Sequence, residues 1–221
     1  MLLAWDTSTD VVTVAVHDGS QLLAHRTGDA VRRHAEVLTP LIAAALADVG
    51  VRGSDLQGIA VGVGPGAYTG LRVGLVTAQT LATAWAVPAQ GACSLDALAV
   101  QALHEHPSRF GDGLLVVVDA RRGHVFWARY TAEGRRVSGP AVDVPTALAA
   151  RRLPAVGSGA LAHGELFTQA LEPSTPDAGW LSSGLLDGRI TPLPVAPLYL
   201  RQPDVTRSTG AKSVLQPGRR R

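Results

Sequence analysis

The chain has 221 residues, of which 46% are hydrophobic, and a formal net charge of +2. This length and composition predict a soluble globular protein of one large domain or two small ones. The last 17 residues carry five cations and no acid, so the first 204 carry −3 and a basic nucleic-acid groove across the body is not expected. The only lysine, Lys212, lies in that tail, which excludes a Walker phosphate loop or a Schiff-base lysine in the body.

The single cysteine, Cys93, excludes an internal disulfide framework and a cysteine-based zinc site. No apolar run approaches the length that spans a membrane, and no basic leader precedes Asp6. We therefore expect a cytoplasmic protein without a membrane partner.

The first half of the chain combines strands with three helices. Hydrophobic spacing and turn residues predict strands at 2–6, 11–17 and 21–27, a helix over 33–49, a strand ending near residue 61, a helix over 69–86, a strand at 88–92 and a helix over 94–104. Pro40 is expected either to kink the first helix or to mark its start. The first three strands predict an antiparallel meander.

The second half repeats this opening. A linker at 105–113 is followed by a predicted hairpin at 114–119 and 124–130, a strand at 136–144, a helix from about residue 146 and a strand-to-turn segment at 155–159. Each half begins with a hairpin whose first strand ends in an aspartate, Asp6 or Asp119. This weak repeat predicts domains at 1–104 and 114–203, followed by a basic, disordered tail at 204–221.

The segment 62–75 joins a glycine-rich turn to a helix with one bare face. Small residues recur at four-residue steps along that face, at Gly70, Gly74, Ala78, Ala82 and Ala86. Glycine costs about 1 kcal/mol relative to alanine inside a helix, so the stripe predicts the close approach of a backbone, a helix or a ligand. A large side chain there, as in Gly74→Leu, is expected to prevent a partner helix from packing.

The same segment formally matches a dinucleotide-binding pattern through Gly62, Gly64 and Ala67. Pro65 interrupts the turn, however, and positions 85–90 hold no acid for the ribose. A turn followed by tight helix packing is therefore the favoured interpretation.

Asp6-Thr7-Ser8-Thr9 and Asp119-Ala120-Arg121-Arg122-Gly123 are the strongest candidates for chemistry. Two turns with an acid at the strand end can face each other across a cleft and hold a phosphate-bound metal. The alternative is that both are ordinary turns, in which aspartate followed by small residues is common. The histidines show no metal-ligand spacing, and no metal site is predicted.

Taken together, several segments resemble the bacterial TsaB (YeaZ) family. They are Leu3-Ala4-Trp5-Asp6-Thr7-Ser8-Thr9, His34 with Leu38-Thr39-Pro40, residues 62–75, Ser94-Leu95-Asp96-Ala97-Leu98, Val118-Asp119-Ala120-Arg121-Arg122-Gly123 with Val125-Phe126-Trp127-Ala128, Gly157-Ser158-Gly159, and Pro197-Leu198-Tyr199-Leu200-Arg201. The resemblance implies an α/β, actin-like and Hsp70-like ATPase (ASKHA) fold of two related domains, the second reduced. It places a nucleotide site at Asp6, Thr7, Ser8, Asp119, Gly157 and Gly159.

The family role is that of a non-catalytic subunit in making threonylcarbamoyladenosine beside the tRNA anticodon. The resemblance implies binding to a TsaD-type transferase, support for recruiting a TsaE-type ATPase, a homodimer when alone, and contact with tRNA through the complex. The transferase carries a metal-binding histidine pair where this chain has Ser94 and Leu98, and these side chains cannot replace it. The resemblance implies that the chain itself requires no cofactor, and that ATP or ADP with Mg²⁺ is bound, if at all, at the level of the complex.

In this family the first-domain helices form the partner interface. The residues implied here are His34, Leu38, Leu41, Gly66, Tyr68, Thr69, Gly70, Arg72, Val73, Gly74 and Ala78. The alternative function is an active phosphotransferase or ATPase that uses Asp6 and Asp119. A third reading, a peptidase, is disfavoured because no metal cluster can be assembled from the sequence.

Overall fold

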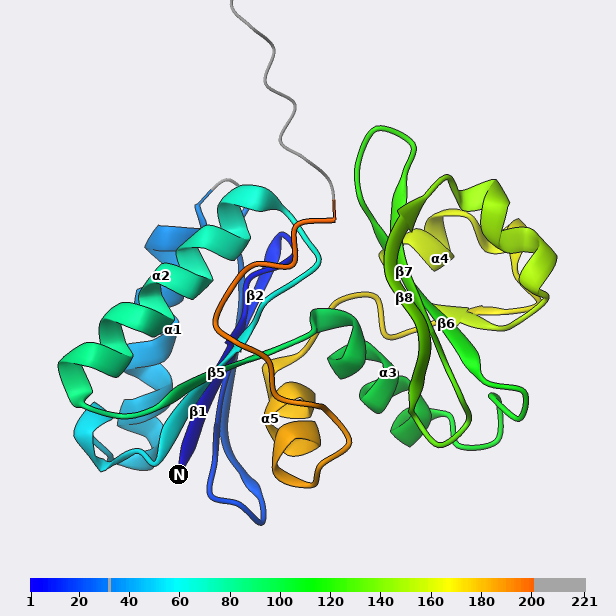
Figure 1. Ribbon diagram of the computed structural model, residues 1–221. Helices are drawn as coiled ribbons and strands as arrows, with labels where there is room; N and C mark the ends of the chain where they lie inside the picture. Colours follow the sequence, from blue (N-terminus) through cyan, green and yellow to red (C-terminus); the bar gives the residue numbers. More distant parts are fainter. Residues whose placement is uncertain (32, 201–221) are drawn as a thin grey trace, which may run out of the picture.

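The computed structural model describes residues 1–31 and 33–200, which form two α/β units side by side (Figure 1). The basic tail predicted at 204–221 lies outside the described residues. No helix in the described part of the chain is long and apolar enough to cross a membrane.

The first unit is built on a five-stranded sheet in the order β3-β2-β1-β4-β5. Its strands are β1 (Leu2–Asp6), β2 (Val11–His17), β3 (Leu22–Asp29), β4 (Gly58–Gly62) and β5 (Ala89–Ala92). β1, β2 and β3 pair antiparallel, as the predicted meander requires, whereas β4 and β5 continue the sheet in parallel.

The second unit repeats this topology in a reduced form. Its sheet has the order β10-β9-β6-β7-β8, formed by β6 (Leu114–Asp119), β7 (Val125–Tyr130), β8 (Arg136–Asp143), β9 (Ala155–Val156) and β10 (Ala170–Leu171). β6 takes the place of β1, with an antiparallel hairpin on one side and parallel strands on the other. The parallel strands have only two residues each, so the predicted repeat is confirmed and the second copy is the smaller.

Helices cover both faces of the first sheet (Figure 1). α1 (His34–Val49) and α2 (Tyr68–Trp85) pack on the face that carries Leu3 and Trp5, whereas α3 (Ser94–Glu105) and α5 (Ala178–Leu186) pack on the face that carries Leu2 and Ala4. This division follows from the alternation of side chains along β1. Pro40 lies inside α1 and does not mark its start.

α3 lies between the two sheets and contacts both (Figure 1). Ala97 and Val100 join the core of the first unit, whereas Leu95 and Leu98 pack against β6 and β7. Tyr130 also donates a hydrogen bond to Asp96 Oδ1 at 2.6 Å. The helix therefore connects the two units through packing as well as through the chain.

The C-terminal part of the described chain returns to the first unit, contrary to the domain boundary expected at 203. α5 packs on β1 and β2, and Leu193 exchanges backbone hydrogen bonds with Gly91 on β5. Leu193, Val195 and Leu198 pack against the first core. The returning segment covers an apolar sheet face and the edge of β5, which would otherwise meet water.

The remaining elements are short. They are η1 (Gly53–Asp55), η2 (Pro145–Arg151), α4 (Ser158–Ala162) and η3 (Gly164–Leu166). The helix predicted from residue 146 is thus a 3₁₀ segment that begins at Pro145, which fixes the backbone angle of a first turn.

His25 on β3 fastens the start of α5. Its Nε2 lies 2.6 Å from Asp177 Oδ2, and Asp177 also accepts hydrogen bonds from the backbone N–H groups of Gly179 and Trp180 as the N-cap of α5. The hydrogen bond to Asp177 raises the pKa of His25. Burial of Asp177 favours a higher pKa, but the hydrogen bond to His25 opposes this effect, and the pKa of Asp177 is lowered.

Candidate functional site

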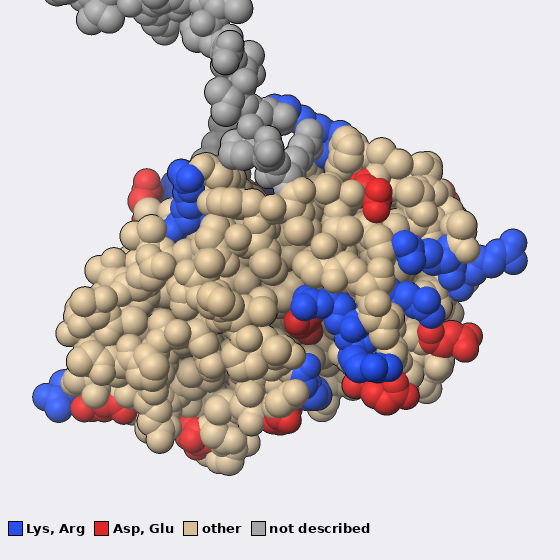
Figure 2. Space-filling model, in the orientation of Figure 1, with Lys and Arg blue, Asp and Glu red and all other residues tan. Residues whose placement is uncertain are grey.

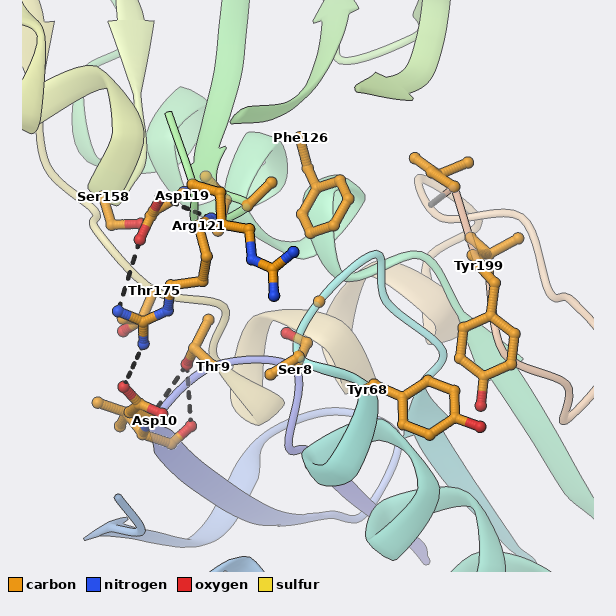
Figure 3. A pocket seen from close by; sticks show the side chains of 18 residues that line it. Ser8, Thr9, Asp10, Tyr68, Asp119, Arg121, Phe126, Ser158, Thr175 and Tyr199 are labelled. Carbon is orange, nitrogen blue, oxygen red and sulfur yellow. Dashed lines mark hydrogen bonds and ion pairs between the residues drawn. The ribbon is translucent and has the colours of Figure 1, made fainter. Parts of the chain in front are cut away.

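A cleft of about 650 Å³ lies where the ends of β1 and β6 face each other (Figure 3). Its walls come from both units and from the returning C-terminal segment. Polar groups are contributed by Ser8, Thr9, Asp10, Asp119, Arg121, Arg122, Ser158 and Thr175, and apolar surface by Val11, Val118, Phe126, Leu198 and Leu200, with Tyr68 and Tyr199 at the end of the cleft beside α2.

Asp6 does not face this cleft. Its side chain is fully buried, and its Oδ1 accepts hydrogen bonds from the Ser8 backbone N at 2.7 Å and Ser8 Oγ at 2.6 Å. Its Oδ2 accepts a hydrogen bond from Ser94 Oγ at 2.5 Å. Burial is the main reason that the pKa of Asp6 is raised. The carboxyl group is therefore occupied in joining β1 to the start of α3.

The other residues predicted for nucleotide binding are either buried in packing contacts or line the cleft. Thr7 is fully buried and donates a hydrogen bond from Oγ1 to Gly70 O at 2.9 Å, whereas Ser8 lines the cleft. Gly157 and Gly159 pack beneath β6, where a Cβ on Gly157 would lie 2.3 Å from Val117 O. Of the residues predicted for nucleotide binding, only Ser8 and Asp119 line the cleft.

The second turn, between β6 and β7, has an unusual backbone. Arg121, Arg122 and Gly123 have φ angles of 61°, 53° and 72°. For a residue other than glycine this left-handed conformation costs roughly 1–2 kcal/mol. Arg121 N donates to Asp119 Oδ1 at 2.9 Å, and Ala120 N donates to His124 O at 2.9 Å. These bonds close the turn at the cleft.

Arg121 joins the two units across the cleft (Figure 3). Its Nη2 lies 2.7 Å from Asp10 Oδ2, and its Nη1 lies 3.6 Å from Asp119 Oδ2. Sequence reasoning did not identify Asp10 as a partner, because its position opposite Arg121 depends on the packing of the two units.

These residues do not fit a magnesium-bound nucleotide. Mg²⁺ in such sites is held by one or two carboxylates together with substrate phosphates. Here Asp6 is enclosed by Ser8 and Ser94, while Asp10 and Asp119 share the Arg121 guanidinium. The described residues contain no group of three or more His, Cys, Asp or Glu side chains that could hold a metal ion.

The glycine stripe of α2 faces its own chain. A Cβ on Gly70 would lie 2.3 Å from Thr7 O, and one on Gly74 would lie 2.3 Å from Thr7 Oγ1. Trp5 Nε1 also donates to Gly74 O, at 3.2 Å. The predicted close approach is therefore correct, but the neighbour is the end of β1. Gly70 and Gly74 are therefore not available to a partner helix.

Of the other predicted interface residues, three are buried and six are exposed or half-buried. Leu38 and Ala78 are fully buried, and His34 is buried with its Nε2 2.8 Å from Thr9 O. Exposed or half-buried positions are Leu41, Gly66, Tyr68, Thr69, Arg72 and Val73. These six are the part of the predicted interface that a partner can reach.

The outer face of α1 and α2 carries mostly small or apolar side chains, and the exposed charged residues of the two helices are Glu36, Asp48 and Arg72. α2 contains one charged residue, Arg72, and its Val76 is 60% exposed. Ala35, Thr39 and Ala43 on α1 and Thr80 and Ala84 on α2 are also exposed. Figure 2 shows a broad surface without charge over α2. Val76 was not among the predicted interface residues, because that prediction was based on the glycine face of α2. The helical period places Val76 on another side of the helix.

Tyr199 contacts α2 and thereby holds the returning C-terminal segment against this helix. Its ring stacks on Tyr68 with 5.1 Å between the ring centroids, and its hydroxyl oxygen accepts a hydrogen bond from Arg72 Nε at 3.0 Å. The Arg72 guanidinium lies 4.0 Å from the Tyr68 ring centroid. In the sequence, only the position of Tyr199 in the segment 197–201 indicated that this residue could matter.

Comparison with known proteins identifies the family. Residues 26–185 match the family described as TsaD, tRNA N6-adenosine threonylcarbamoyltransferase. The structure of YeaZ from Pseudomonas aeruginosa superposes with a TM-score of 0.74 at 30% identity, over 90% of this chain and 99% of that one. The chain belongs to the TsaB (YeaZ) family. Its fold is the two-domain, actin-like and Hsp70-like ATPase (ASKHA) fold that the sequence predicts.

Similar proteins from other organisms match this chain over different shares of their own length. An uncharacterised protein of Mycobacterium tuberculosis is 42% identical over 92% of this chain and 92% of its own length. An uncharacterised protein of Mycobacterium leprae is 41% identical over 92% of this chain. The tRNA threonylcarbamoyladenosine biosynthesis protein TsaB of Escherichia coli is 33% identical over 58% of this chain. The matches span about half of the last two proteins, 55% and 54% respectively.

Proposed function

We propose that the chain is an accessory subunit of tRNA threonylcarbamoyladenosine biosynthesis, which binds a TsaD-type transferase through the exposed face of α1 and α2. In this role it performs no transfer itself. It stabilises the active transferase, supports recruitment of a TsaE-type ATPase in the cytoplasm, and meets tRNA through the complex. Without the transferase, the same face joins two copies of the chain.

The outer face of α2, where Arg72 is the one charged residue, carries this proposal together with the small exposed side chains of α1. Exposed Val76 lies on a helix with one charged residue, and small side chains on both helices leave room for a second helix pair. Interface cores are depleted in charge in the same way. Membership of the TsaB family makes a TsaD-type transferase the expected partner.

The state of the cleft supports an accessory role over the alternative of an active ATPase. Asp6, which the alternative needs as a metal or phosphate ligand, is buried behind Ser8 and Ser94. Asp119 lies beside a guanidinium of its own turn. Asp6 is therefore not positioned to hold a metal-bound phosphate, and Asp119 shares its side of the cleft with a cation.

Substituting glutamate for Val76 is expected to weaken binding to the transferase at least about tenfold, because association would bury an unpaired charge. The affinity of the two purified proteins, measured by isothermal titration calorimetry, checks this result. Leu161→Glu is the matched control, since Leu161 is 41% exposed on the second unit. If Val76→Glu binds as tightly as the wild type, this face is not the interface.

A further inference from the structure

We propose that Arg121 is an ionic clasp that holds the two units together across the cleft. The inference goes beyond the accessory role and does not depend on it. It makes the width of the cleft depend on one ion pair, in addition to the packing of α3 against both units.

The clasp is defined by contacts between two turns far apart in sequence. The Arg121 guanidinium lies within 2.7 Å of Asp10, which follows β1, and within 3.6 Å of Asp119 at the end of β6 (Figure 3). The Arg121 guanidinium thus lies between an acid of the first unit and an acid of the second. Removing it takes away the cation that both carboxylates contact.

The backbone of the turn supports a specific role for this arginine. Its φ angle of 61° is one that glycine or asparagine adopts more easily. Strained positions of this kind persist where the surrounding structure determines them. Asp119 Oδ1 accepts the Arg121 backbone N–H, so the same acid that faces the guanidinium also fixes the turn from which it extends.

The exposure of the pair makes the clasp reversible. The Arg121 side chain is 70% exposed and that of Asp10 is 41% exposed. Ion pairs of this exposure are modest in strength and are screened by salt. The clasp is therefore expected to shift a balance between closed and open forms of the cleft, and salt is expected to weaken it.

Distances between spin labels on the two units test the clasp in the full chain. Exposed Ser54 and Ala162 are replaced by cysteine and labelled. The buried native thiol of Cys93 does not compete, because desolvation raises its pKa to about 12. Double electron–electron resonance then gives the distance distribution for each variant at low and high salt.

Arg121→Gln is expected to increase the open fraction about two- to fivefold at low salt. Asp10→Asn is expected to give the same change, and the double variant no further change, because both act on one pair. Arg26→Gln is the matched control, since Arg26 pairs with Asp48 at 2.6 Å inside the first unit. High salt should open the wild type but not Arg121→Gln. Identical distributions for the wild type and Arg121→Gln at low salt would overturn the proposal.

Discussion

Gly70→Ala is expected to destabilise the folded chain by about 1–3 kcal/mol, the range for adding volume to a well-packed site. The same substitution in an ordinary helix interior stabilises by about 1 kcal/mol, so the sign itself is informative. The added Cβ would lie 2.3 Å from Thr7 O, a backbone atom that cannot move without disturbing β1. Urea denaturation of the two proteins measures the difference.

Ala84→Gly provides the control on the same helix. Ala84 is exposed in the last turn of α2, so this change should follow helix propensity and cost at most about 1 kcal/mol. A more stable Gly70→Ala protein would contradict the close contact between α2 and the end of β1. The contact also changes the meaning of Gly74→Leu, because that variant is expected to damage the fold and cannot test an interface with a partner.

Asp6→Ala is expected to cost about 3–5 kcal/mol, since the change removes the acceptor of three buried hydrogen bonds. The Ser8 backbone N–H and the Ser8 and Ser94 hydroxyl groups would lose their partner in a region without access to water. A drop in the urea midpoint with an unchanged m-value would report this loss. Activity lost in such a variant therefore says nothing about catalysis by Asp6.

Asp119→Ala is the comparison for this prediction. Asp119 also ends the first strand of its unit, but its side chain is 46% exposed and faces the cleft. Its removal should change the free energy of unfolding by no more than about 1 kcal/mol. Equal losses for the two aspartates would show that Asp6 does not hold the buried network described above.

Local sequence patterns predicted most of the first unit and the repeat. Alternating apolar residues and turn residues defined the hairpins that end in Asp6 and Asp119, because these signals act over a few positions. The return of the C-terminal segment to the first unit was not predictable in this way. It depends on contacts such as Leu193 with Gly91, about a hundred residues apart.

The sequence indicated which residues of the candidate site matter more accurately than it indicated what each of them does. The bare stripe of α2 correctly signalled a close neighbour, but spacing along a helix does not say whether that neighbour is a partner or Thr7. Asp6 and Asp119 are equivalent in the repeat, yet one is buried and the other lines the cleft. Burial depends on what packs around each turn, which is a property of the whole fold.

Reconstitution with a purified TsaD-type transferase, a TsaE-type ATPase, the activated threonylcarbamoyl donor and tRNA tests the accessory role most directly. We expect the modification of tRNA to require the chain, and Val76→Glu to reduce it together with binding to the transferase. The chain alone, given ATP and Mg²⁺, should show no turnover. Full modification without the chain, or ATP turnover by the chain alone that Asp119→Ala abolishes, would contradict the account.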